Sequence, residues 1–298
     1  MRSNKNSSSG SFAIVPNDKS ASNYEYFIGK SLSHFEKTFA DLSLDQQPFE
    51  AWIKILLKTP FWASKTSHLP TIKDICIEFA KAQDLAFSVT PEPKYHNRSH
   101  FKEVCLSMTQ LLKAQNDILP PLDNVSTWKM SDHDSWILLL CAICHDFDHD
   151  GSMNKYPFEL EKKSLEMIDA FMEQISIDSV NRKNIQSTIE PIILATDPRY
   201  FPTLVSKFDV AGSFNHSDCM AMLLVESDLL ASTLPARGEI LGKLLSEEWQ
   251  AHYPEAAMTV STNKGRLKFL ENIRFISPQS HALGIEDIRR ISINQVKE

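Results

Sequence analysis

The sequence predicts an all-α protein, and two features of its pattern and composition carry this prediction. Apolar residues recur at spacings of three and four, for example at Phe49, Trp52, Ile53 and Leu56, which is the period of an amphipathic helix. Glycine is scarce, with 8 among 298 residues, below the usual share of about 7%. A sheet with many tight turns is therefore disfavoured, and strict two-residue alternation over a strand length is hard to find.

Helical spacing returns along most of the chain, so we expect a single, compact, multi-helix domain over residues 23–298. The Ser- and Asn-rich residues 1–22 are expected to be disordered or loosely attached. Further helical segments are predicted at 72–80, 165–172, 220–230 and 240–249. Clusters of Pro, Ser and Asp predict breaks at 120–124, 196–198 and 232–235.

Charge and cysteine usage exclude several classes of protein. The net charge of −7 gives no electrostatic basis for binding nucleic acid, and an acidic protein that binds phosphates needs metal ions or local cations. Five cysteines, most of them within apolar runs, predict buried thiols in a reducing compartment. No secretory signal follows Met1, and the longest apolar run is about half of the ~20 residues that span a membrane. We expect a cytoplasmic protein without membrane association, whose oligomeric state the sequence leaves open.

Two short segments concentrate metal-binding side chains. YHNRSH places His96 and His100 four residues apart, which puts them on one face if the segment is helical. HDFDHDG repeats that spacing with His145 and His149, and adds Asp146 directly after the apolar run that precedes it. Each pair alone is more often a surface feature or a satisfied part of the core than a metal site.

Two carboxylates on other predicted helices complete the candidate set. Asp228 lies in the apolar helix MLLVESDLLAS, and Glu166 lies in KKSLEMIDAF, after the second motif. A buried, unpaired carboxylate is costly, and a divalent metal removes that cost. Because the pieces occur together where only core positions are expected, the set predicts metal binding.

The residue types also indicate what the metals would do. A carboxylate that follows a ligand histidine can bridge two ions ~3.5–4 Å apart, the arrangement used in phosphoryl chemistry. Mixed His and Asp ligands suit a zinc-like ion, and an oxygen-rich second position suits magnesium or manganese. Water between two cations becomes hydroxide at neutral pH, and a histidine outside the metal shell can protonate the leaving oxygen.

These motifs resemble a known family. YHNRSH resembles the YHNxxH motif of class I 3′,5′-cyclic nucleotide phosphodiesterases, which belong to the HD-domain metal-dependent phosphohydrolases. CHDFDHDGSMN matches their HDxDHxGxxN motif. Weaker similarities follow in order at residues 192–208, at SEEWQAHYPE (246–255), which resembles the family's EEF segment, and at 269–278. The resemblance covers about residues 90–280 and implies an α-helical phosphodiesterase-type catalytic domain with a two-metal site.

The resemblance implies a role for each matching residue. Ligands of the first metal, expected to be Zn²⁺, would be His100, His145, Asp146 and Asp228. Asp146 would bridge to a second ion, expected to be Mg²⁺ or Mn²⁺. Catalytic roles would fall to His96 as general acid, to Glu166 as a partner of the bridging water or of His96, and to His149 at the phosphate. Substrate-binding and pocket-shaping residues would be Tyr95, Asn97, Thr196 and Phe275.

Some positions depart from the family's pattern. A histidine pair is expected after Glu166, where this chain has Met167, Ile168 and Asp169. The glutamine that reads the purine in the family has no clear counterpart, and discrimination between bases would be weak or would fall to groups such as Asn272 or Gln279. The implied substrate is a small-molecule cyclic nucleotide, cAMP or cGMP or both, hydrolysed by a metal-bridging hydroxide to the 5′-monophosphate.

Two other functions stay open at this point. One is an HD-domain phosphohydrolase that acts on another nucleotide phosphoester, although a triphosphatase would need more basic residues than the four near the motifs (Lys94, Arg98, Lys155 and Lys162). The other is a catalytically inactive binding protein on the same fold. The YHN sequence before His100 favours the phosphodiesterase.

Overall fold

The computed structural model describes residues 27, 29–66, 72–117 and 125–298, and these residues form helices with no strand. The all-α prediction is confirmed. The predicted break at 120–124 and the N-terminal residues 1–22 lie outside the described residues, so the division at residue 22 stays a prediction.

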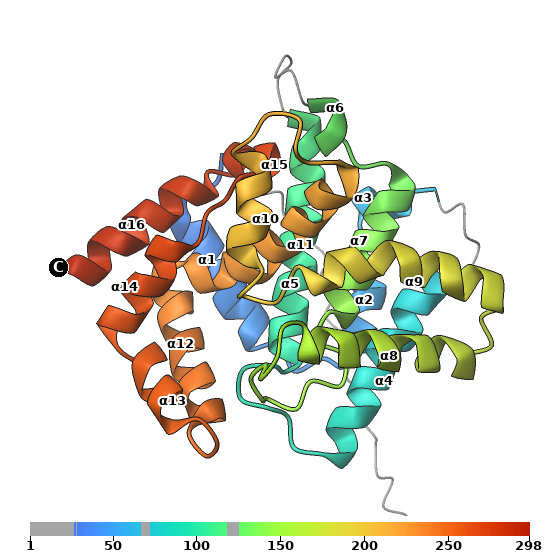
Figure 1. The fold of residues 1–298 in the computed structure, drawn as a ribbon, viewed down its shortest axis with the longest axis horizontal. Coiled ribbons are helices and arrows are strands. Elements are labelled where there is room, and N and C mark those ends of the chain that lie inside the picture. The colour runs from blue at the N-terminus through green and yellow to red at the C-terminus, as the bar shows by residue number, and fades with distance from the viewer. Residues whose placement is uncertain (1–26, 28, 67–71, 118–124) are drawn as a thin grey trace, which may run out of the picture.

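The longest of the described connections, residues 145–158, joins α7 to α8, and α5 crosses the middle of the molecule (Figure 1). The helices are α1 (Leu32–Ser43), α2 (Phe49–Leu56), α3 (Pro60–Ala63), α4 (Ile72–Val89), α5 (Arg98–Ala114), the 3₁₀ turn η2 (Gln115–Asp117), α6 (Val125–Trp128), α7 (Asp132–Cys144), α8 (Glu159–Gln174), α9 (Ser179–Leu194), α10 (Phe201–Phe208), α11 (His216–Thr233), α12 (Pro235–Trp249), α13 (Pro254–Val260), α14 (Asn263–Asn272), α15 (Pro278–Ala282) and α16 (Ile285–Lys297).

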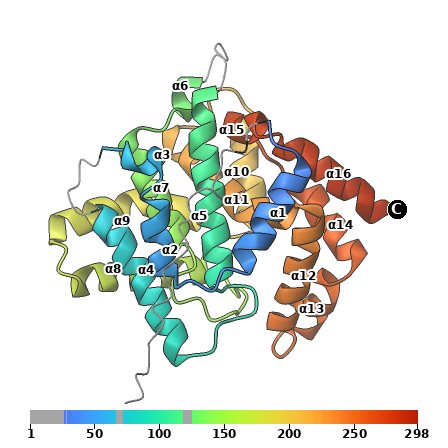
Figure 2. The same ribbon diagram turned by 180° about the vertical axis from the view of Figure 1, so that it is seen from behind.

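Three helices, α5, α7 and α11, form the centre of the molecule. Continuous stretches of each are buried, over residues 100–112, 135–144 and 218–227. A helix that is apolar on all sides has to be enclosed by other helices, and α5 packs against both α7 and α11. Helices α12 to α14 and α16 lie on one flank and α8 and α9 on the other, as the opposite views show (Figures 1 and 2).

The start of α5 is fixed by Asn97. Its side-chain oxygen accepts hydrogen bonds from the backbone N–H groups of Ser99 and His100, at 2.9 and 3.2 Å. An asparagine cap satisfies N–H groups that have no partner inside the helix. His96 therefore precedes the helix, and the prediction that it shares a helix face with His100 is wrong, because the extended cap residue separates them.

The second motif, HDFDHDG, follows the end of α7 and forms a turn. The helix ends at Cys144, and the following residues, including His149, lie outside any helix. Asp148 has φ of 62° and Gly151 of 76°, both in the left-handed region. The chain thus turns sharply after His145, and His149 does not stack above it on a helix face.

All five cysteines are buried and free, as the sequence predicts. Burial raises the pKa of each thiol. A thiol that stays protonated in an apolar core is a poor nucleophile and metal ligand. Cys141 and Cys144 therefore serve as core residues of α7.

In the described part of the chain, no individual helix has both the length and the apolar character needed to cross a bilayer. The helices α11 and α12 meet that test only as a pair, across a bend of 98°. The cytoplasmic location expected from the sequence stays a prediction.

A buried ion pair ties α12 to the central helix α5. Arg237 donates to Glu103 through Nε at 2.7 Å and through Nη2 at 2.6 Å, and both residues are at most 5% exposed. Burial raises the pKa of Glu103 to about 7, although Arg237 opposes the rise. Removing one partner of such a pair leaves an uncompensated buried charge.

We expect Arg237→Met to lower the free energy of unfolding by about 3–5 kcal/mol, and Glu103→Leu combined with Arg237→Met to recover most of that loss. Urea denaturation measures both. The folded state raises the pKa of Glu103, so folding takes up a proton at pH values between the unfolded and folded pKa values. The loss in free energy of unfolding caused by Arg237→Met should therefore be smaller at pH 5, where Glu103 can be neutral, than at pH 8. A double variant as unstable as the single one would contradict this account.

Candidate metal centre and active site

Four side chains meet at one place, which we call the four-ligand cluster: one each from α5 and α11, and two from the turn that directly follows α7. Nε2 of His100, in the first turn of α5, lies 3.3 Å from Oδ1 of Asp228 on α11 and 3.6 Å from Oδ2 of Asp146. Nε2 of His145 lies 3.2 Å from Oδ2 of Asp146 and 3.8 Å from Oδ1 of Asp228. The structure thus brings together the four residues that the sequence predicted as metal ligands.

The cluster fits a divalent metal ion. The Nε2 atoms of His100 and His145 are buried and have no hydrogen-bond partner. An unsatisfied buried polar atom costs about 1–3 kcal/mol. An ion between these nitrogens and the carboxylates would satisfy all four groups at once. Two imidazoles and two carboxylates are a donor set that suits zinc.

The electrostatics of the cluster favour positive charge. Burial alone would lower the pKa of His145, but the carboxylates of Asp146 and Asp228 raise it to about 9. Burial opposes ionisation of Asp146 as well, yet His145 and His100 hold its pKa well below the usual range. The carboxylate therefore stays ionised and attracts a cation.

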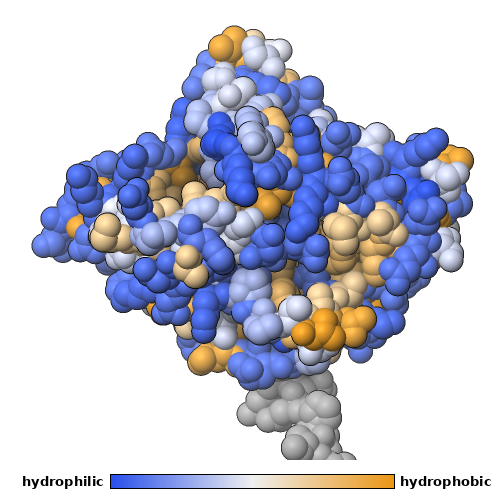
Figure 3. Space-filling view, turned by 60° about the horizontal axis from the view of Figure 1, so that its bottom comes forward, coloured by the Kyte–Doolittle hydropathy of each residue, from blue (hydrophilic) through white to orange (hydrophobic). Residues whose placement is uncertain are grey.

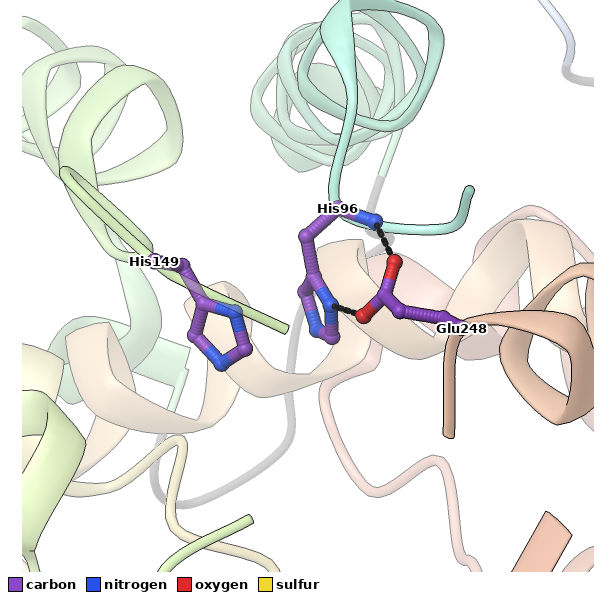
Figure 4. Close-up of side chains that lie close together, drawn as sticks. All are labelled: His96, His149 and Glu248. Atoms are coloured by element: carbon purple, nitrogen blue, oxygen red, sulfur yellow. Dashed lines mark hydrogen bonds and ion pairs between the residues drawn. The ribbon is translucent and has the colours of Figure 1, made fainter. Parts of the chain in front are cut away.

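His96 lies beside the cluster and is held by Glu248 of α12 (Figure 4). Nδ1 of His96 is 2.5 Å from Oε1 of Glu248, whose other oxygen accepts the backbone N–H groups of Tyr95 at 2.6 Å and His96 at 3.1 Å. Because a carboxylate only accepts, Nδ1 carries a proton. Nε2 of His96 lies 3.8 Å from Oδ2 of Asp146, so it faces the cluster.

Glu248 is the carboxylate that contacts His96, a role for which the sequence suggested Glu166. The structure puts Glu166 on the exposed face of α8, so the predicted contact between Glu166 and His96 is wrong. Its other suggested role, a bond to water at the metals, stays a prediction. A signal for Glu248 existed in SEEWQAHYPE, but only the direction of α12 decides which acid of that segment reaches His96.

The buried carboxylate of α8 is Glu161, a second residue that the sequence did not single out. Glu161 is 8% exposed, and both of its oxygens accept from the side-chain amide of Asn154 at 3.0 Å. Burial raises its pKa to about 6, and the charges of Asp197 and Asp146 add to the rise. The buried acid of α8 is therefore Glu161, which is held by Asn154 and lies five residues before Glu166.

His149 stacks on His96, with ring centroids 3.8 Å apart and an angle of 28° between the planes (Figure 4). His96, His149 and Glu248 lie close enough to be considered a metal site. An imidazole binds metal in its ring plane, however, so two stacked rings cannot both direct a nitrogen at one ion. We therefore assign no metal to this group.

His149 is a neutral hydrogen-bond donor. Burial lowers its pKa to about 4, and the neighbouring His96 adds to the effect. Its Nδ1 accepts the backbone N–H of Gly151 at 2.9 Å, so in the neutral ring the proton lies on Nε2. That N–H is available to an anionic group beside His96.

Gly151 allows Glu248 to approach. Its φ of 76° is in the region that favours glycine, and a Cβ at this position would lie 3.1 Å from Cγ of Glu248. The glycine of the HDxDHxGxxN match therefore lets the turn after His149 lie directly against the carboxylate that holds His96.

The four predicted substrate-binding residues have different surroundings. Tyr95 lies in the site, with its ring 4.9 Å from that of His100, whereas Asn97 is the cap of α5. Thr196 donates to the carbonyl of Ile193 at 2.7 Å, and Phe275 is 3% exposed within the core. Their roles in substrate binding stay predictions.

A cavity of about 530 Å³ opens beside the four-ligand cluster from the side of α4 and α8. His96, Asp146 and His149 line one part of it, and Phe87 and Phe171 are among its apolar residues. Figure 3 brings this end of the molecule forward and shows apolar side chains bordered by hydrophilic ones. The volume falls in the range of small-molecule sites. Neither Thr196 nor Phe275 lines this cavity.

The helical fold and the buried His–Asp cluster are those of a metal-dependent phosphohydrolase. The family model for 3′5′-cyclic nucleotide phosphodiesterases matches residues 95–262, more than half of the chain. The chain therefore belongs to this family.

Solved structures show the same fold. The phosphodiesterase domain of Salpingoeca rosetta rhodopsin phosphodiesterase is similar with a TM-score of 0.56 and 15% identity, over 82% of this chain and 93% of that chain. The phosphodiesterase domain of the RhoPDE fusion protein from the same choanoflagellate gives 0.51 and 14%, over 82% and 97%. At such identities the likeness concerns the fold alone. The comparison with curated proteins gave no match.

We expect metal to stabilise the protein through the four-ligand cluster. Zinc at 100 times its dissociation constant contributes about 2.7 kcal/mol, which corresponds to a Tm about 5–10 °C higher than that of the EDTA-treated protein. Asp228→Ala should abolish the shift, and Asp287→Ala, which removes an exposed acid, should retain it. Differential scanning fluorimetry with Zn²⁺, Mn²⁺ and Mg²⁺ measures the effect, and no shift with any of the three would refute the site.

Proposed function

We propose that the protein hydrolyses 3′,5′-cyclic nucleotides, cAMP or cGMP or both, to nucleoside 5′-monophosphates in a metal-dependent reaction. One observation carries the proposal. The unpartnered nitrogens of His100 and His145 meet two carboxylates directly beside His96, whose second nitrogen is held by Glu248. Membership of the phosphodiesterase family supports it.

Two divalent ions are part of this proposal. The four-ligand cluster would hold the first, for which Zn²⁺ fits the donor set, and Asp146 would bridge to a second, Mg²⁺ or Mn²⁺. When bound, such ions lower the pKa of water to supply a nucleophile and neutralise charge on the phosphate.

His96 is the proposed general acid. Glu248 fixes its ring through Nδ1, so Nε2 is the nitrogen left to face the substrate. Burial would lower the pKa of His96, but the bond to Glu248 and the charge of Asp146 raise it above its ordinary value, which favours the protonated ring that a general acid needs. Protonation of O3′ as the P–O3′ bond breaks would avoid an alkoxide leaving group.

His149 is proposed to bind the phosphate. Its Nε2–H lies beside the ring of His96, and the ring is locked by the bond from Gly151 to Nδ1. A neutral donor in that position can orient a phosphate oxygen without adding a charge that would compete with bound metal ions.

The nucleoside end of the substrate is proposed to bind differently from the family pattern. Asn272, one candidate for reading the base, is exposed, and Gln279 is buried with its amide donating to the carbonyl of Trp128 at 2.9 Å. Neither lines the cavity beside His96. Weak discrimination between adenine and guanine follows if no other group reads the base.

The decisive assay is hydrolysis of cAMP and cGMP by metal-reconstituted protein, with 5′- and 3′-monophosphates resolved by chromatography. We expect a metal-dependent 5′-product from both substrates, and none from Asp146→Ala, which lacks a ligand of the cluster. Bound metal without turnover of either nucleotide would instead favour another phosphoester substrate or a binding protein.

A second variant tests the general acid. His96→Ala should lower kcat by about 10²–10⁴, because the leaving oxygen loses its proton source, while the metal content stays unchanged. His252→Ala, which removes an exposed histidine near the end of α12, is the matched control and should have full activity. Unchanged turnover in His96→Ala would show that the leaving oxygen receives its proton from another group.

A further inference from the structure

The junction of α11 and α12 is a sharp corner that connects two parts of the site. The two helices meet at Leu234 with a bend of 98°. Before the corner, α11 carries Asp228 of the four-ligand cluster, and beyond it α12 carries Glu248, which holds His96. The angle at the corner therefore decides where Glu248 lies relative to the cluster.

Arg266 of α14 binds the carbonyl groups of this corner. Its Nη2 donates to the carbonyls of Leu234 at 2.8 Å and Pro235 at 3.1 Å, and Nη1 lies 3.5 Å from the carbonyl of Ser232. The charges of Glu239 and Glu36 act on this guanidinium, but the hydrogen bonds it makes within the described part of the chain go to these three carbonyls. The partners of Arg266 are thus peptide groups of the corner.

The fold leaves room for this contact. A Cβ at Gly238 would lie 2.6 Å from Nη1 of Arg266 and 2.1 Å from the carbonyl oxygen of Ser232. No side chain fits there without displacing the guanidinium or the backbone. The first turn of α12 therefore accommodates Arg266 only because this position is a glycine.

Other helices hold the same corner. Glu36 of α1 accepts the N–H groups of Ala236 at 2.7 Å and Arg237 at 3.0 Å, and Ser292 of α16 donates to the carbonyl of Thr233 at 2.6 Å. Arg266 differs from these in binding both sides of the bend, since its acceptors belong to the end of α11 and to the first residue of α12.

Because α12 is long, a small change of the bend at the corner displaces Glu248, near the other end of the helix, by a larger distance. At 1.5 Å per residue, Glu248 lies about 20 Å along the helix from Pro235. A rotation of about 5° at the corner would move that end by roughly 2 Å. The 2.5 Å bond between Glu248 and His96 does not survive such a shift, unless His96 follows and leaves its place beside Asp146.

We propose that Arg266 is a positioning residue for the active site, which fixes the angle between α11 and α12 and thereby keeps Glu248 in contact with His96. Its catalytic consequence rests on the proposed function, in which His96 is the general acid. The positioning role of Arg266 does not depend on the proposed function, because the bond between Glu248 and His96 can be observed without any substrate.

The first test is a nuclear magnetic resonance measurement on protein with ¹⁵N-labelled histidine. A proton in a short Nδ1–H···carboxylate bond resonates far downfield, and we expect this signal for His96 in the wild type. It should disappear in Glu248→Gln and in Arg266→Met, and persist in Arg289→Met. Arg289 is the matched control, since it also donates to a helix carbonyl, that of Leu270, but has no contact with the corner.

The second test uses leaving groups. An analogue of cAMP with sulfur in place of O3′ releases a thiolate, which needs little protonation. Arg266→Met should lose about tenfold or more in kcat on cAMP and less than about twofold on the thio analogue, a selective loss typical of general-acid variants. Adding Glu248→Gln should cause little further loss, because both changes act through one contact.

Three results would overturn the proposal. They are a persistent downfield signal in Arg266→Met, an equal loss on both substrates, and additive effects in the double variant. If Arg266→Met does not fold, Arg266→Lys replaces it, and an unchanged signal and substrate ratio in that variant count against the proposal. A wild type that shows the signal but cleaves no cyclic nucleotide would refute the proposed function and the catalytic role of Arg266, and leave its positioning role standing.

Discussion

The arrangement of the whole molecule depends on bringing two buried imidazoles and two carboxylates to one point. The Nε2 atoms of His100 and His145 are buried and lie between 3.2 and 3.8 Å from carboxylate oxygens of Asp146 and Asp228. Such a group is unfavourable in a protein interior. The folded chain maintains it because α5, α7 and α11 are enclosed by apolar packing on all sides. A divalent ion held between the four groups would offset this cost, and the energy so recovered would contribute to its binding affinity.

The histidine beside this centre, which we propose as the general acid, is positioned by a different part of the fold. His96 lies just before α5, yet the carboxylate that orients it comes from α12, more than 150 residues later. The two are kept together by a glycine at position 151 that permits close approach and by the corner from which α12 departs. In the proposed mechanism, metal binding and proton transfer would thus rest on separate parts of the structure, and a substitution could impair one and leave the other intact.

Much of the fold and of the centre was predictable from local sequence. Helical periodicity and scarce glycine predicted the all-α architecture. The resemblance carried by HDFDHDG, YHNRSH and the helix of Asp228 named the four residues that the structure brings together. Local geometry was less predictable, because the cap at Asn97 and the turn after Cys144 interrupt the helices that the four-residue spacing suggested. Short polar side chains compete with the helix for backbone hydrogen bonds at such points.

The sequence by itself therefore determined the fold class through its helical periodicity. Its motifs indicated the family and the four residues that meet at the cluster, because local sequence carries both. Only the tertiary structure decided which acid holds His96, which acid of α8 is buried, and where a substrate-sized cavity opens. Glu166 and Glu161 differ by little more than one helical turn, and only the packing of α8 determines that the second is buried. Glu248 reaches His96 because of the angle between two helices, which no local pattern encodes.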